Sequence, residues 1–276
     1  MDELPYPLWN HWHVHYEVLI GLSAIQLLYL VFVGPVRKRY DFADSVDPRQ
    51  TLIFTSAILI TLFSLVSPLH VLSDTYLFSA HMLQHVLLTL IVPPMFILGT
   101  PKWIFRKILL ARYLFWLSRI FTNPFITFIL FNMVFSLWHI PEMYNLSLSN
   151  RLVHISEHLM FIATATLMWW PITSPIPELP RLSYPFQMMY LFLLSIFQIV
   201  VFAPITFSNF PIYKLYADAP RVWSSISPLA DQQIGGIIMK LSGSLIFITL
   251  IIVAFFRWFK NDDGQTKFQT NNHLKK

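Results

Sequence analysis

Two pairs of histidines in this sequence lie four residues apart, His81 with His85 and His154 with His158. On an α-helix this spacing places both imidazoles of a pair on one face, one turn apart. Glu157 lies beside the second pair and adds a carboxylate. Because imidazole binds copper, zinc, iron and nickel, and ligates haem, the two pairs predict a metal or haem site.

The rest of the composition narrows the chemistry of that site. The chain has no cysteine, so it has no disulfide, no thiolate ligand and no cysteine nucleophile. Any metal must therefore be bound by histidine, carboxylate, methionine or backbone. The thioethers that could contribute, or that could simply fill the core, are Met82, Met143, Met160 and Met239.

The elements that would position these side chains are membrane helices. Hydrophobic residues make up 55% of the chain, charged residues only 12%, and the mean hydropathy is +0.57. Soluble domains average roughly a quarter charged residues. This composition excludes a soluble enzyme, a disordered protein and a nucleic-acid binder. It predicts an all-α polytopic membrane protein, with residues 1–276 as a single membrane domain.

A helix that crosses the bilayer needs about 20 apolar residues. Seven transmembrane helices are predicted, with approximate ranges 17–36, 51–70, 76–98, 125–139, 152–172, 184–207 and 235–257. The basic and apolar segment 102–121 is expected to lie along the inner interface as a helix. The longest connection, 208–234, is either a lid over the outer face or a plain linker.

Lys and Arg in the connections predict the orientation. One set of connections, together with the tail 258–276, carries fifteen of these residues, and the opposite set carries three. Since basic residues stay inside, the N-terminus is predicted outside and the C-terminus in the cytoplasm. Nine of the 10 histidines then fall on the outer side, His70 and His139 among them at span ends. Ionisable groups within a span usually face the bundle interior.

Lys240 is the one basic residue predicted inside a span, about one and a half turns into the seventh. We expect its side chain to snorkel to the outer interface. Pairing with Asp231 or Glu157 is the alternative.

The segment 81–101, HMLQHVLLTLIVPPMFILGTP, resembles the signature of the CtaG family of caa3-type cytochrome c oxidase assembly factors. Segment 139–171 contains His-x-Pro, His-x-x-Glu-His and Trp-Trp-Pro and is similar to the second signature of that family. The Asp-Gln motif at Asp231 resembles the third, which opens the last span. Lys240 and Ser242-Gly243 depart from the aromatic residue and the Pro-Gly expected there.

This resemblance implies a multi-pass protein of the bacterial plasma membrane that is not an enzyme. It implies that the protein matures a copper-containing oxidase by supporting insertion of the CuB copper into subunit I. The implied partners are cytochrome c oxidase subunit I, an external copper donor and the lipid bilayer, with no nucleic acid. The copper ligands that the resemblance implies are His81, His85, His139, His154 and His158, with Glu157 alongside.

Two other functions stay open at this point. A seven-span zinc hydrolase resembling the alkaline ceramidase and adiponectin-receptor group would need three histidines and a water on the metal. It would also need a Ser and an Asp within the spans, whereas Asp74 and Asp231 are predicted at span edges. A b-type electron carrier would use two histidines on facing helices to ligate haem. A membrane di-iron desaturase is not favoured, since adjacent His-His pairs on the cytoplasmic side are absent.

Overall fold

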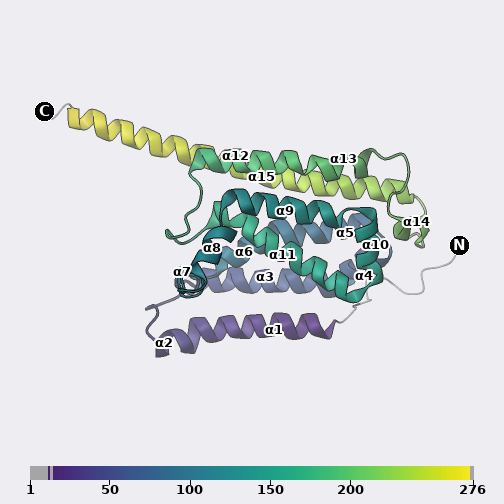
Figure 1. Cartoon of the computed structure of the whole chain (residues 1–276), viewed down its shortest axis with the longest axis horizontal. Helices are drawn as coiled ribbons and strands as arrows, with labels where there is room; N and C mark the ends of the chain where they lie inside the picture. The colour runs from purple at the N-terminus through teal and green to yellow at the C-terminus, as the bar shows by residue number, and fades with distance from the viewer. Residues whose placement is uncertain (1–11, 13–14, 274–276) are drawn as a thin grey trace.

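The computed structural model describes residue 12 and residues 15–273, with side chains as far as residue 261. Within these residues the chain forms only helices and loops (Figure 1). The first half contains α1 (Tyr16–Val31), the π-helical turn η2 (Phe32–Val36), α2 (Arg37–Arg39), α3 (Pro48–Val66), α4 (Pro68–Thr75), α5 (Phe78–Val86), the π-helical turn η3 (Leu87–Ile91), α6 (Val92–Gly99) and α7 (Lys102–Leu109). The second half contains α8 (Phe115–Phe121), α9 (Pro124–Trp138), α10 (Pro141–Ser149), α11 (Arg151–Thr173), α12 (Tyr184–Phe197), α13 (Ile199–Phe207), α14 (Lys214–Asp218) and α15 (Pro228–His273).

The helices confirm an all-helical protein with several candidate membrane spans. Six segments of the described chain are long and apolar enough to cross a bilayer, namely Tyr16–Arg39, Pro48–Val66, Phe78–Gly99, Arg151–Thr173, Tyr184–Phe207 and Pro228–Asn261. The predicted span 125–139 corresponds to α9, which qualifies only together with α8, and the pair is bent by 65°. The count is therefore six, or seven if the bent pair is one span. The orientation of the termini stays a prediction.

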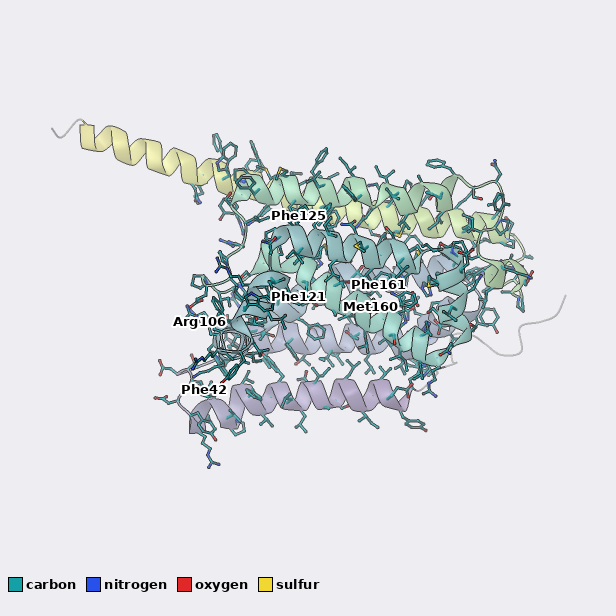
Figure 2. The ribbon with its side chains drawn as sticks, in the orientation of Figure 1. Phe42, Arg106, Phe121, Phe125, Met160 and Phe161 are labelled. Atoms are coloured by element: carbon teal, nitrogen blue, oxygen red, sulfur yellow. The ribbon has the colours of Figure 1, made fainter. Side chains whose placement is uncertain are left out.

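The long helices run side by side along the bundle (Figure 1). α15 packs against α5, α12 and α13, while α11 packs against α9 and α6, and α3 packs against α6. The short helices α4, α10 and α14 lie together at one end, on the right of Figure 1, and we call this the site end. α7 and α8 lie at the opposite end, where Figure 2 labels Phe42 and Arg106.

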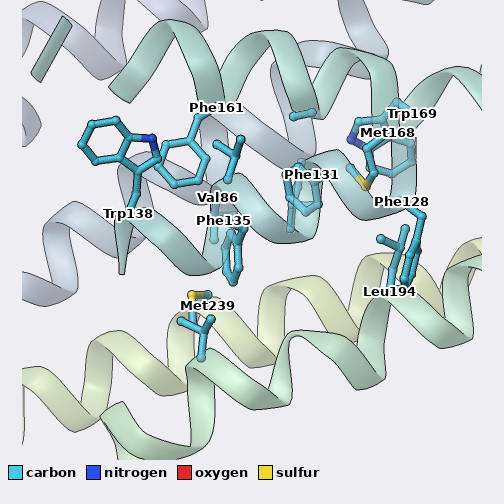
Figure 3. Packing of buried hydrophobic residues seen from close by; sticks show 14 of the residues in the cluster. Val86, Phe128, Phe131, Phe135, Trp138, Phe161, Met168, Trp169, Leu194 and Met239 are labelled. Atoms are coloured by element: carbon cyan, nitrogen blue, oxygen red, sulfur yellow. The ribbon is translucent and has the colours of Figure 1, made fainter. Parts of the chain in front are cut away.

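The main core lies between α9, α11 and the α12–α15 layer (Figure 3). Phe131 and Phe161 are each 1% exposed, and Met168 is fully buried. In contrast, α1 is loosely packed, with only 6% of its apolar window buried. Its main anchor is Tyr29, whose ring stacks on Phe54 and whose hydroxyl donates to the Gly99 carbonyl at 2.9 Å.

Two prolines free backbone carbonyls that side chains of neighbouring helices then satisfy. Pro68 has no N–H, so the Ser64 carbonyl four residues earlier loses its helical partner. Gln84 donates its Nε2 to that carbonyl at 2.7 Å. The carbonyl of Thr89 is freed by Pro93 in the same way, and it accepts the Trp169 indole N–H at 2.9 Å. These two contacts fix α5 and η3 against α3 and α11.

Several helix boundaries differ from the predicted ranges. The predicted span 51–70 ends at Val66, because the Ser67-Pro68 break places His70 on the separate helix α4. The predicted interfacial helix 102–121 is two helices, α7 and α8. α15 begins at Pro228 rather than 235 and continues into the predicted tail as far as His273. Residues 274–276 of that tail lie outside the described residues.

Both expectations for Lys240 were also wrong. Its Nζ donates to the backbone carbonyl and the hydroxyl of Ser195 on α12, at 2.7 and 3.1 Å. The ammonium is therefore solvated by a neighbouring span and joins α15 to α12.

Candidate metal centre

The predicted ligands converge at the site end of the bundle from three helices. His81 and His85 lie one turn apart on α5, with ring centroids 4.3 Å apart. His158 on α11 lies 6.4 Å from the first ring and 6.1 Å from the second. His139 directly follows α9, and its ring lies 5.7 Å from that of His85. The His81–His85 face of α5 is thus directed at His158 on α11.

The most deeply buried group of ligand atoms, which we call the inner cluster, consists of His81, His85 and Glu157. The Glu157 Oε1 atom lies 3.6 Å from His85 Nε2 and 3.9 Å from His81 Nε2. Such separations are too long for hydrogen bonds, which span about 2.7–3.2 Å. They are close to the spacing of ligand atoms that each lie about 2.0–2.2 Å from one shared metal ion.

Many ligand atoms of this region are buried without a hydrogen-bond partner. In the part of the chain that the structure describes, both ring nitrogens of His81, His85 and His158 lack a hydrogen-bond partner. The same holds there for Glu157 Oε1 and His139 Nε2. Leaving one such group unsatisfied costs about 1–3 kcal/mol, so native proteins rarely collect them in one place. A cation bound among these atoms would satisfy several of them at once, and the residues fit a metal.

His139 is held in the form that binds metal. Its Nδ1 lies 2.6 Å from the Phe135 carbonyl, which can only accept, so Nδ1 carries the proton. In the neutral ring Nε2 then has its lone pair available. A hydrogen bond of this kind commonly orients a ligating histidine.

Two supporting residues hold the inner cluster in place. Ser147 on α10 donates its hydroxyl to Glu157 Oε2, which leaves Oε1 directed at the histidines. Asp231 on α15 accepts the backbone N–H of Phe78 at 2.7 Å and that of Ser79 at 3.3 Å, together with the Ser79 hydroxyl. These N–H groups open α5, so a carboxylate from another helix caps the helix that carries His81. Neither role was predicted from the sequence.

A second group of ligand atoms, the outer cluster, consists of His70, Asp74 and His154. Asp74 Oδ2 lies 3.4 Å from Nε2 of each of the two histidines. The surrounding helices remove much of the water around Asp74, and this burial raises the pKa of its carboxyl to about 7. His154 was predicted as a ligand beside His158. Its Nε2 atom is directed at Asp74 of the outer cluster. His70 and Asp74 were not among the ligands predicted from the sequence.

Four aromatic side chains, which we call the aromatic cap, pack over the inner cluster at the site end. They are Phe78, Tyr144, Tyr213 and Tyr216, and none is more than 2% exposed. The Tyr144 ring lies 5.0 Å from that of His81, and the Tyr213 hydroxyl donates to the His139 carbonyl at 2.9 Å. Two members of the cap come from the connection 208–234, which covers the cluster as a lid would.

On its other side the inner cluster rests on the apolar core. The ring of Phe161 lies 4.5 Å from that of His85, and Figure 3 shows Phe161, Phe135 and Met239 in the same packed layer. Met239 lines a small cavity together with His85. Figure 2 labels Met160 next to Phe161, and Met160 is 37% exposed, which is unlike a ligand of a buried centre.

The chain is similar in sequence to one described protein family and to two curated proteins. Residues 27–261 match the model of a family described as "Cytochrome c oxidase caa3 assembly factor (Caa3_CtaG)". Two curated proteins described as uncharacterized, from Mycobacterium bovis and Mycobacterium tuberculosis, are each 26% identical to the chain over 202 residues. These matches cover 67% of this chain but only 30% of each relative, so the chain spans under a third of their length. No solved structure matches the chain.

Proposed function

The chain belongs to the family of caa3-type cytochrome c oxidase assembly factors, and from this membership we propose that it binds copper at the inner cluster and supports CuB insertion into oxidase subunit I. Copper is the cargo of the protein in this proposal and not a resident cofactor. An external donor supplies the ion, and the protein works in the bacterial plasma membrane with its N-terminus outside. The site end then faces outward, which agrees with the excess of Lys and Arg in the other set of connections.

One observation carries the proposal: unpartnered imidazole nitrogens surround a single carboxylate oxygen in a fully buried place. His81 is 0% exposed, Glu157 1% and His85 3%. An exposed cluster of this kind would be solvated by water, and a structural cluster would be hydrogen-bonded. Histidine and carboxylate without cysteine give moderate affinity for copper, which suits a protein that must release the ion.

The alternatives are less well supported by the same geometry. A zinc hydrolase needs an open coordination position and room for a substrate beside the metal. Burial of His81, His85 and Glu157 to 3% exposure or less leaves little such room. A haem between two histidines needs a flat slot for the macrocycle. The His81 and His85 rings instead lie 4.3 Å apart on one helix face.

The test is the metal content of the detergent-purified protein. We expect wild type to retain copper and H81A/H85A to lose it while it accumulates normally in the membrane. In cells that carry this variant, the oxidase should keep its haem and lack CuB under copper limitation. H273N, in the C-terminal tail, is the matched histidine control and should retain copper.

Several results would contradict the proposal. Normal oxidase activity of H81A/H85A under copper limitation would make the cluster structural. Zinc in place of copper, or a haem absorption spectrum, would favour one of the alternatives. For the orientation, a reporter fused within 208–227 should read external and one fused after residue 119 should read cytoplasmic.

A further inference from the structure

The inner cluster is closed on one side at the site end. The aromatic cap covers it there, and hydrogen bonds lock the cap in place, since the Tyr144 and Tyr216 hydroxyls are 2.8 Å apart and Tyr216 donates to the Ser73 carbonyl. The apolar layer around Phe161 closes the opposite side. An ion bound at His81 and Glu157 therefore needs another route in and out.

The outer cluster provides a more open approach. The Asp74 side chain is 27% exposed and that of His154 is 14% exposed, against 1% for Glu157. Asp74 lies against His154, and His154 in turn lies against Glu157 of the inner cluster. The ionised form of a partly exposed carboxyl group also attracts cations.

His154 and Glu157 connect the two clusters. The two ring nitrogens of His154 face different groups, with Nε2 at 3.4 Å from Asp74 Oδ2 and Nδ1 at 3.9 Å from Glu157 Oε2. Glu157 in turn directs Oε1 at His85. The His154 and His158 rings are only 4.5 Å apart. Ligand atoms thus follow one another without a break from Asp74 to His85.

His70 makes the outer cluster the weaker of the two sites. Gln84 Nε2 is directed by its hydrogen bond to the Ser64 carbonyl and lies 3.2 Å from His70 Nδ1, which therefore accepts. The proton of neutral His70 is then on Nε2, where it faces His15 Nε2 at 2.9 Å. A metal ion must displace this proton and disturb that hydrogen bond, whereas the ring nitrogens of His81 and His85 have no such partner among the described residues.

We propose that His70, Asp74 and His154 form a second copper site, weaker than the inner cluster, through which the ion reaches the inner cluster by way of Glu157. The existence of this site does not depend on the proposed function. The direction of transfer, from the outer to the inner cluster, does rest on it.

The test counts copper ions per chain and measures how fast they bind. The purified full-length protein is titrated with Cu(I) in anaerobic buffer that contains ascorbate, and bound copper is measured by elemental analysis. We expect two ions on wild type at saturation and one on H70Q/D74N. H81A/H85A should also bind one ion in this titration, because its weaker outer site loses copper during purification and refills when copper is supplied. H70Q/D74N should load its remaining site at least tenfold more slowly than wild type.

Controls separate these effects from misfolding. D74N alone keeps the shape of the side chain and should weaken copper binding at the outer site. It replaces the paired variant in this test if H70Q/D74N is unstable. E178Q removes an exposed carboxylate that pairs with Arg106 at the other end of the bundle, and it should bind two ions at the wild-type rate. Thermal unfolding of every variant in detergent shows whether it is folded.

The outcomes distinguish the two proposals. If H81A/H85A binds no copper, or if H70Q/D74N loads as fast and as fully as wild type, the second site is wrong and the proposed function stands. If instead the outer variant loses an ion and the inner variant loses none, the second site stands and the inner copper centre is wrong. Wild type that binds no copper at all overturns both.

Discussion

Removing the Asp231 carboxylate should destabilise the first turn of α5, the helix that carries His81 and His85. D231A deprives two backbone N–H groups, of Phe78 and Ser79, and one hydroxyl of their acceptor. Asp231 is 1% exposed, so water cannot replace it easily. At about 1 kcal/mol for each hydrogen bond, the expected loss in the free energy of unfolding is about 3 kcal/mol.

D231N tests whether the effect comes from capping. The amide keeps one oxygen that can accept from the helix N-terminus, but it loses the charge that interacts with the helix dipole. We expect D231N to lose about half as much, ~1.5 kcal/mol. The matched control is D218A, an exposed aspartate of α14 at the same end of the bundle, which should change stability by less than about 0.5 kcal/mol.

The measurement is reversible unfolding in mixed micelles, with copper content determined on the same samples. The expected order of stability is wild type equal to D218A, then D231N, then D231A, with copper retention in the same order. A D231A protein as stable as wild type would refute the capping argument. Equal losses for D231N and D231A would show that the charge alone matters.

Three further predictions concern packing and pH. G99A should lose about 1–3 kcal/mol, because its Cβ would lie 2.6 Å from the Phe54 backbone nitrogen. G21A is the control, because its added Cβ meets nothing within 4 Å, and it should be neutral or gain up to about 1 kcal/mol. If G99A and G21A changed the thermal unfolding equally, the close packing of α3 on α6 would be contradicted. W169F removes the donor to the Thr89 carbonyl and should cost about 1–3 kcal/mol in the same assay. Copper retention should fall as the pH is lowered, since protons compete with the ion for imidazole nitrogens. Retention that stays unchanged when the loaded protein is dialysed into increasingly acidic buffers would show that histidines are not the ligands.

Local pattern was enough to predict the two histidine pairs and Glu157. His81 with His85, and His154 with Glu157 and His158, were predicted because residues three or four apart on one helix share a face regardless of the rest of the fold. The helical, membrane-spanning class followed equally from composition, since hydropathy needs no knowledge of tertiary contacts.

Contacts between helices were what the sequence did not reveal. His70 and Asp74 join His154 only because Pro68 ends α3 and turns α4 across the site end. The Ser67-Pro68 dipeptide was a readable signal for that break. Ser147, in contrast, carries no sequence signal, because its role depends on how α10 folds back on α11.

The single carboxylate of the inner cluster sets a charge count. With neutral imidazoles, Glu157 contributes one negative charge among His81, His85 and His158. A monovalent ion therefore leaves the buried group neutral, and a divalent ion leaves it with one net positive charge. An unbalanced charge in such a place costs several kcal/mol. We expect the protein to bind Cu(I) more tightly than Cu(II). Competition with chelators for each ion would show the difference. Oxidation of the bound ion would then weaken its binding to the protein.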